Sequence, residues 1–270
     1  MVDPVLICPV CGAPLDLTDA QARCTSGHSF DRAKEGYFNL LRSHKQGDRM
    51  GDDKQAARYR RDFLNRGYYA CLQHALTDFF AGKQGTLLDI CCGEGYYTSA
   101  LGALPGLRVY GFDLAKEMVR LAAKRGGGTY FVANLAHLPV AESSFDWAVH
   151  LFAPFQEAAF CRLLKPGGRL ITVVPGPDHL FGLKKAVYDR PYRNDGALPK
   201  TAQLRQVETM TVRDEIDLAS QQDIQAVFRM TPYYYRTGPQ DRAKLTPLDH
   251  LATPIEFILG VYEKPARSGA

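Results

Sequence analysis

Three cysteines and one histidine near the N-terminus follow the pattern C-x2-C-x12-C-x3-H. Cys8 and Cys11 form the first pair, and Cys24 and His28 form the second. Structural zinc takes four such thiolate and imidazole ligands in a tetrahedron, and two short turns supply them in pairs. The spacing therefore predicts a small zinc-binding module over residues 1–35 that depends on its metal to fold. With four protein ligands, the site keeps no position for a catalytic water.

The cysteines of the whole chain do not have the pattern of a secreted disulfide scaffold. It has seven cysteines, an odd number, and Cys91 and Cys92 are adjacent. A redox CxxC is disfavoured because such pairs stand beside a βαβ pattern, which the first 35 residues lack. Buried thiols without metal are the second alternative. The chain has no apolar run of about 18 residues and no signal-peptide pattern, so we expect a cytoplasmic protein that does not enter membranes.

From residue 85 onward, short apolar segments alternate with amphipathic ones. The expected strands are residues 86–90, 107–112, 129–132, 145–149 and 169–174, with helices such as 95–103 between them. This alternation predicts βαβ units and a parallel sheet. Two more strands, 207–218 and 255–262, flank a helix expected near 221–229. A chain of 270 residues has room for one such domain beside the zinc module.

Residues 36–84 are predicted to form a helical connector. The apolar spacing indicates one helix from a cap at Asp52 to about Arg66, ended by Gly67, and a second helix over 68–81. The stretch 32–66 has ten Lys and Arg against five Asp and Glu, a surplus of five positive charges, whereas the whole chain is +4. Such a stripe suits a polyanion such as RNA, with a solvated face of mixed charge as the alternative.

Within this basic stretch, we predict that the adjacent pair Arg60 and Arg61 contacts RNA phosphates and lies away from the methyl-donor pocket. Arg58 is a weaker candidate, because it belongs to a motif with apolar residues and can be structural. If the pair instead forms salt bridges along its own helix, its loss changes stability only slightly.

A glycine loop, Asp89-Ile-Cys-Cys-Gly93-Glu94-Gly95, follows the first strand of the alternating region. Glycines at such a turn let the backbone approach a ligand closely. The dinucleotide fingerprint fails, because Thr98 stands where its third glycine is required. The loop instead has the acid-and-glycine pattern of S-adenosylmethionine enzymes, with Cys91 in place of the first glycine. A turn without a ligand is the alternative.

Two polar residues at later strand ends complete the predicted donor site. Asp113 ends the second strand, where a carboxylate can accept hydrogen bonds from both ribose hydroxyls, and Asn134 follows the third strand near the expected adenine edge. The fold class is therefore α/β: a Rossmann-like class I S-adenosylmethionine-dependent methyltransferase domain over residues 85–270, with a small N-terminal zinc-binding module.

Several motifs extend this pattern over nearly the whole chain. They are the zinc motif, GHSFDRAKEGYFNLL at 27–41, ARYRRDFLNRGYY at 57–69, DICCGEGYYT at 89–98, PGPDHL at 175–180 and MTP at 230–232. In these motifs the chain resembles the RlmA/RrmA family of large-subunit ribosomal RNA guanine-N1 methyltransferases. Related enzymes that give resistance to tylosin-type macrolides belong to the same family.

The resemblance implies transfer of a methyl group from S-adenosylmethionine to N1 of a guanosine in 23S ribosomal RNA. It implies Zn²⁺ on Cys8, Cys11, Cys24 and His28, a zinc module that recognises RNA, and a homodimer with an RNA-binding cleft. The donor contacts that it implies are Tyr69, Gly93, Glu94 and His179. The sequence departs from the family at Tyr68, where histidine is frequent, and at Cys91, where glycine is usual.

Methylation at N1 requires the guanine to lose its N1 proton before or during attack on the methyl group. The segment 150–155 replaces the tetrapeptide usual after the fourth strand, and Phe152 or Phe155 is the expected stacking surface for the base. The candidate proton acceptors are Asp178, His150 and His179. Two other functions stay open: a non-catalytic zinc-bearing RNA-binding protein, and a small-molecule methyltransferase.

Overall fold

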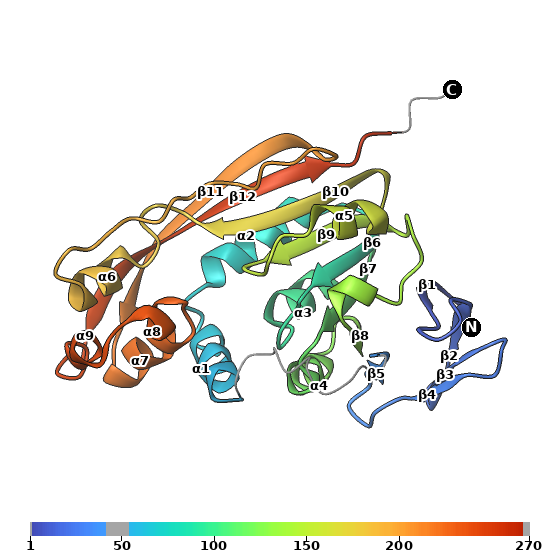
Figure 1. Ribbon diagram of the computed structural model, residues 1–270, viewed down its shortest axis with the longest axis horizontal. Helices are drawn as coiled ribbons and strands as arrows, with labels where there is room; N and C mark the ends of the chain where they lie inside the picture. The colour runs from blue at the N-terminus through green and yellow to red at the C-terminus, as the bar shows by residue number, and fades with distance from the viewer. Residues whose placement is uncertain (1, 42–53, 267–270) are drawn as a thin grey trace.

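The computed structural model describes residues 2–41 and 54–266, and Figure 1 shows their arrangement. The predicted cap at Asp52 lies outside these residues, as do three basic residues of the connector: Arg42, Lys45 and Arg49. None of the described helices is long and apolar enough to cross a bilayer.

The N-terminal module is a small antiparallel sheet in the order β1-β2-β3-β4. Its strands are β1 (Val2–Ile7), β2 (Pro14–Leu17), β3 (Gln21–Cys24) and β4 (Ser29–Asp31). The sequence gives little sign of these strands, because three of the four have only three or four residues. The four predicted metal ligands lie in the turns between these strands or, for Cys24, at the end of β3.

An eight-stranded sheet forms the centre of the molecule, in the order β11-β12-β10-β9-β6-β7-β8-β5. Its strands are β5 (Phe38–Asn39), β6 (Gly85–Ile90), β7 (Leu107–Asp113), β8 (Thr129–Val132), β9 (Phe145–Leu151), β10 (Leu164–Pro175), β11 (Arg205–Leu218) and β12 (Leu251–Glu263). The neighbours from β5 to β10 pair in parallel, whereas β12 is antiparallel to both β10 and β11. The predicted α/β fold class is confirmed, and so are all seven predicted strands.

Two features of this sheet differ from the expectation. Strand β10 begins at Leu164 rather than Arg169, and its pairing with β9 shifts register between these residues, where Pro166, Gly167 and Gly168 lie. Strand β5 adds two residues of the connector to the edge of the sheet beside β8. It was not predicted, because a two-residue strand has no period to detect.

Helices pack around the sheet and gather at one end of it. The helices are α1 (Lys54–Asn65), α2 (Ala70–Phe80), α3 (Tyr96–Gly102), α4 (Lys116–Arg125), α5 (Glu157–Leu163), α6 (Phe181–Val187), α7 (Gln221–Arg229), α8 (Tyr233–Arg236) and α9 (Pro239–Ala243), with a short 3-10 turn at Leu135–His137. Helices α7 to α9 are inserted between β11 and β12, and they lie near α1 and α6 (Figure 1). Both helices predicted in the connector are present, and α1 packs on α7.

The zinc module is joined to the large sheet and does not hang from a linker. Leu6 bridges to Val140, and the Ile7 amide donates to the Pro139 carbonyl at 3.0 Å. The Tyr110 hydroxyl of β7 donates to the buried Asp3 carboxylate at 2.8 Å. Apolar residues of β1 to β3 share one buried cluster with β6 to β8. Loss of the metal site should therefore also lower the stability of the larger sheet.

Candidate active site and metal centre

The four predicted metal ligands converge at one point of the N-terminal module. The ligand atoms of Cys8, Cys11, Cys24 and His28 all lie within 4.8 Å of one another. Cys8 and Cys11 flank the turn after β1, and the Val10 amide points at the Cys8 sulfur from 3.4 Å. Cys24 ends β3, and Gly27 closes the second turn with φ +87° and a 3.0 Å bond to the Cys24 carbonyl.

The spacing of these atoms fits a zinc ion. Cys11 Sγ lies 3.7 Å from Cys24 Sγ, and His28 Nδ1 lies 3.6 Å from Cys8 Sγ and 3.4 Å from Cys24 Sγ. A zinc–sulfur bond of about 2.3 Å requires ligand atoms about 3.8 Å apart at the corners of a tetrahedron. A hydrogen bond from the Ala13 backbone and one from the Ser26 side chain also lower the pKa of Cys11 to about 6, which favours the thiolate that the metal requires.

A cavity of about 870 Å³ lies at the carboxyl ends of the parallel strands. Its wall includes residues at or near the ends of five neighbouring strands: Asp89 in β6, Asp113 at the end of β7, Asn134 after β8, His150 in β9 and Val174 in β10. The strand order reverses between β6 and β9, and α/β sheets bind their ligands in the crevice at such a point. Every donor residue predicted from the sequence lines this cavity except Gly95.

The glycine loop has backbone geometry that favours ligand approach. Gly93 has φ +55°, and a Cβ added there meets no atom within 4 Å, so it would project into open space. Cys91 keeps a left-handed conformation at φ +58° although it is not glycine, and it lines the cavity. Gly95 has a different role, because a Cβ there would lie 2.9 Å from the Ala122 side chain. Gly95 thus lets α3 and α4 pack closely.

Two aspartates accept hydrogen bonds from the glycine loop and from the residues next to it. Asp113 accepts the Gly93 amide at 3.0 Å with Oδ2 and the Ala115 amide at 2.9 Å with Oδ1. Asp89 is buried and accepts a 2.5 Å hydrogen bond from the Thr98 hydroxyl. Burial raises the pKa of Asp89 to about 7, because a charged carboxylate is poorly solvated there. Asp113 is the carboxylate placed at the end of β7, where the ribose was expected.

Tyr69 and His179 meet in the cavity wall although 110 residues separate them. Tyr69 Oη lies 3.0 Å from His179 Nε2, and the Glu256 amide donates to His179 Nδ1 at 3.3 Å. Burial lowers the pKa of His179 to about 3, so the ring is neutral. The hydrogen-bond network then assigns the proton to Nε2, which donates to Tyr69. The Tyr69 hydroxyl keeps its own proton to donate to a ligand.

Glu94 lies almost fully buried beside the glycine loop, with 2% of its surface exposed. Its Oε1 accepts a hydrogen bond from Arg125 Nη2 at 2.8 Å, whereas Oε2 has no hydrogen-bond partner among the described residues. Arg125 was not predicted, because 31 residues separate it from Glu94 and no motif joins them. Asn134 Oδ1 accepts the Ala136 amide at 3.0 Å, which orients the amide group at the cavity wall.

The three candidate proton acceptors have different surroundings. Neither ring nitrogen of His179 is suited, because one accepts a backbone amide and the other carries the proton. Asp178 pairs with Arg193 and is not among the residues that line the cavity. His150 does line it: Nδ1 lies 2.9 Å from Thr172 Oγ1, and Nε2 is buried without a hydrogen-bond partner in the described parts of the chain.

The two predicted stacking residues also differ. Phe152 is 48% exposed and has φ +55°, a conformation that is strained for a bulky residue. Phe155 packs within an aromatic group, with its ring centroid 5.0 Å from Phe160 and 5.8 Å from His150. Both line the cavity, but Phe152 is the ring with an open face. Residues 230–233, which follow α7, form part of the cavity wall, and the MTP motif falls among them.

The structure changes the expected role of the basic connector. Arg60 lines the same cavity as the predicted donor residues instead of lying apart from them, and Arg61 Nη2 lies 3.6 Å from Oδ1 of its neighbour Asp62. Arg66 forms an ion pair with the buried Asp223 of α7 and so has a structural role. The expectation that this helix lies away from the donor pocket was wrong. Arg58 is exposed and is not part of the cavity wall.

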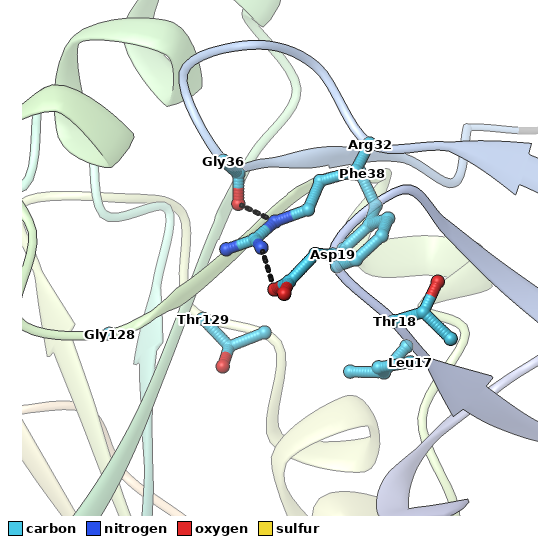
Figure 2. A pocket seen from close by; sticks show the side chains of 8 residues that line it. All are labelled: Leu17, Thr18, Asp19, Arg32, Gly36, Phe38, Gly128 and Thr129. Atoms are coloured by element: carbon cyan, nitrogen blue, oxygen red, sulfur yellow. Dashed lines mark hydrogen bonds and ion pairs between the residues drawn. The ribbon is translucent and has the colours of Figure 1, made fainter. Parts of the chain in front are cut away.

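A second cavity, of about 430 Å³, lies between the zinc module and the β8 edge of the sheet. Figure 2 shows the Arg32 side chain at its centre. The guanidinium donates hydrogen bonds to the Asp19 carboxylate at 3.1 Å and to the Gly36 carbonyl at 3.3 Å. The Phe38 ring lies 5.9 Å from the guanidinium. Arg32, counted above among the basic residues, is therefore paired with an acid.

Two families match parts of this chain. Residues 6–47 match the zinc ribbon described as RlmA, N-terminal, and residues 87–168 match the family described as Methyltransferase domain. The first match contains all four metal ligands. The second contains the glycine loop and extends through the turn before Arg169.

The chain is similar to proteins whose names describe a methyltransferase activity, and two of these matches cover most of its length. The 23S rRNA (guanine(748)-N(1))-methyltransferase of Streptomyces fradiae is 34% identical over 190 residues, which cover 67% of this chain and 67% of the relative. YxjB of Bacillus subtilis (strain 168), provisionally named a 23S rRNA (guanine-N(1)-)-methyltransferase, is 31% identical over 255 residues, which cover 88% of this chain and 89% of the relative.

Proposed function

Because the chain belongs to the family of 23S rRNA (guanine-N1)-methyltransferases, we propose that it transfers a methyl group from S-adenosylmethionine to N1 of a guanosine in 23S ribosomal RNA. The observation that carries this proposal is the single cavity that unites Tyr69, Gly93, Glu94, Asp113 and His179. S-adenosylmethionine and Zn²⁺ are the two cofactors of this enzyme.

The residues of the cavity have separable tasks in this proposal. S-adenosylmethionine, when bound, supplies a methyl group made electrophilic by its sulfonium. Asp113 holds the ribose of the donor, and Gly93 leaves room for it beside the loop. Phe152 offers its open face to the acceptor guanine, which has to leave its stack to reach a buried site. Placing the two reactants together in an aligned geometry lowers the barrier to methyl transfer.

The test of this function is a methylation assay followed by reverse transcription. The full-length protein is incubated with S-adenosylmethionine and unmodified 23S ribosomal RNA, free or within large subunits. Methylation at N1 blocks the pairing edge of guanine, so reverse transcriptase should stop at one position. Mapping that position also tells whether it is guanosine 748, for which the Streptomyces fradiae relative is named.

The assay separates the proposal from its alternatives. Binding of RNA without any methyl transfer would favour a non-catalytic RNA-binding protein. Methyl transfer to small molecules but not to RNA would favour a small-molecule methyltransferase. Either result would contradict the proposed function.

His150 is the residue that we propose as acceptor of the N1 proton. Burial lowers its pKa, so the ring is neutral and able to take a proton, and an Nδ1–H donated to Thr172 would leave the lone pair on Nε2. We expect His150→Asn to lower kcat about 100-fold, the lower range for a general base, because the lowered pKa makes this imidazole a weak base. Activity of the variant should recover as rising pH deprotonates the guanine.

Two measurements accompany the His150 prediction. Donor affinity, measured by calorimetry, should stay within about twofold of the wild-type value, since a general base acts on the acceptor. The matched control is His74→Asn, an exposed histidine outside the cavity, which should keep full activity. A kcat unchanged in His150→Asn would refute the assignment.

The proposal also covers the oligomeric state, the location and the domain boundaries of the protein. We infer a homodimer in the cytoplasm, where ribosomal RNA is modified, as the family resemblance implies. Light scattering of the purified protein should then give twice the chain mass of 30.0 kDa. A single-chain mass at working concentrations would contradict the dimer. We retain residues 1–35, 36–84 and 85–270 as the proposed zinc module, connector and methyltransferase domain.

A further inference from the structure

Two groups of opposite charge face the donor cavity near the glycine loop. Glu94 Oε2 is buried and lacks a hydrogen-bond partner among the residues described, while Oε1 of the same carboxylate is held by Arg125. Burial raises the pKa of Glu94, and the positive charges of Arg125, Arg61 and Arg60 act in the opposite direction. A buried acceptor oxygen of this kind is costly unless a ligand donates to it.

Arg60 brings a positive charge into the same cavity. It lines the wall together with Leu64, which is one helical turn further along α1. Helix α1 is fixed in this orientation by its packing on α7 and by the ion pair between Arg66 and Asp223. The guanidinium is therefore presented to the cavity by a helix that is anchored to the fold.

This pairing of charges matches one chemical group. A carboxylate oxygen suits an ammonium, and a planar guanidinium suits a carboxylate, which it can bind through two parallel hydrogen bonds. An α-amino acid carries both charges on one carbon atom. The methionine part of S-adenosylmethionine ends in such a group, whereas a nucleotide of RNA has phosphate but no ammonium.

We propose that Arg60 binds the α-carboxylate of the methyl donor while Glu94 Oε2 accepts a hydrogen bond from its α-ammonium. This assignment rests on the proposed function, because it takes S-adenosylmethionine as the donor. It makes Arg60 a residue that selects the donor, and it gives helix α1 a part in both the connector and the active site. Arg125 is then a positioning residue that aims the Glu94 carboxylate.

The test compares two ligands that differ in the carboxylate alone. S-adenosylmethionine and decarboxylated S-adenosylmethionine are titrated by calorimetry into the full-length wild-type protein and into Arg60→Met, which keeps a long apolar side chain. We expect Arg60→Met to weaken binding of S-adenosylmethionine about 10- to 100-fold, the loss of a charge-assisted contact. Binding of the decarboxylated ligand should change by less than about twofold.

A matched variant and a second readout complete the experiment. Arg58→Met removes an exposed arginine from the same helix outside the cavity, and it should leave both ligand affinities unchanged. Thermal unfolding of each variant shows that it is folded. RNA affinity is measured against salt concentration, since each lost phosphate contact lowers the logarithmic salt slope by a little under one unit.

Each other outcome would overturn the assignment in a recognisable way. Equal weakening of both ligands in Arg60→Met would mean that Arg60 shapes the cavity without reading the carboxylate. Unchanged affinity for both ligands with a reduced salt slope would place Arg60 on an RNA phosphate. A wild-type protein that binds neither ligand would instead contradict the proposed function itself, and the assignment with it.

Discussion

Replacing Gly93 by valine should abolish binding of the methyl donor while the protein stays folded. The Gly93 amide is held by Asp113, and a side chain at this position would project into open space at the cavity wall. A branched side chain there occupies volume that the donor needs. We expect affinity for S-adenosylhomocysteine to fall at least about 1,000-fold, which corresponds to about 4.1 kcal/mol, as measured by calorimetry.

The control for Gly93→Val must carry the same backbone strain at a distance from the donor. Gly82 follows α2, has φ +73° and also has no atom within 4 Å of an added Cβ, but it does not line the cavity. Both valine variants should lose similar thermal stability, because each forces a β-branched residue into the left-handed region. Equal donor affinity in the two variants would place the donor elsewhere.

Asp113→Ala should have a smaller effect at the same site. The substitution removes the expected ribose acceptor and also releases the Gly93 amide, so we expect a loss of about 1–3 kcal/mol in donor binding. The effect should therefore rank below that of Gly93→Val. Wild-type affinity in Asp113→Ala would show that this carboxylate does not contact the donor.

Replacing Cys8 and Cys11 together by serine should remove the zinc and unfold the N-terminal sheet. The zinc content measured by elemental analysis should fall from about one zinc per chain to almost none, because two of the four tetrahedral ligands are lost. Structural zinc contributes about 10–16 kcal/mol of apparent binding free energy in small modules, which is folding free energy there. RNA affinity should decrease with the module, as filter binding would show.

The fold also predicts an effect of zinc loss beyond the module. Strand β1 bridges to Val140, and its apolar residues share a buried cluster with β6 to β8. The melting temperature of the whole protein should therefore decrease, while donor affinity should change less than RNA affinity. Cys71→Ser, on α2 and outside the ligand group, is the control that should retain zinc. Full metal content in the double variant would exclude the proposed site.

The metal ligands and the glycine loop could be predicted from sequence because each depends on short separations along the chain. A CxxC turn and a turn of three residues bring ligand pairs together whatever the rest of the fold does. The parallel strands could be predicted for a related reason, since strands buried on both faces form continuous apolar runs. The strands β1 to β4 were not predicted, because strands this short around a metal do not need such runs.

The contacts of individual residues within the cavity could not be predicted from the sequence and are seen only in the tertiary structure. Periodicity shows which residues share a helix face, but it does not show what that face meets. The direction of Arg60 depends on the packing of α1 against α7, an element more than 150 residues away. Likewise, the pairing of Tyr69 with His179 joins residues 110 positions apart.

Short spacings along the chain predict the available chemistry: a four-ligand metal site, a glycine loop with an acid at the next strand end, and a stripe of arginines. Which of these groups face one another depends on the packing of the folded chain. It paired Arg32 with Asp19 and Arg66 with Asp223, it turned Arg60 into the donor cavity, and it gave Gly95 a packing role. The physical reason is that local spacing is set by bond geometry, whereas facing surfaces are set by packing between segments distant in the chain.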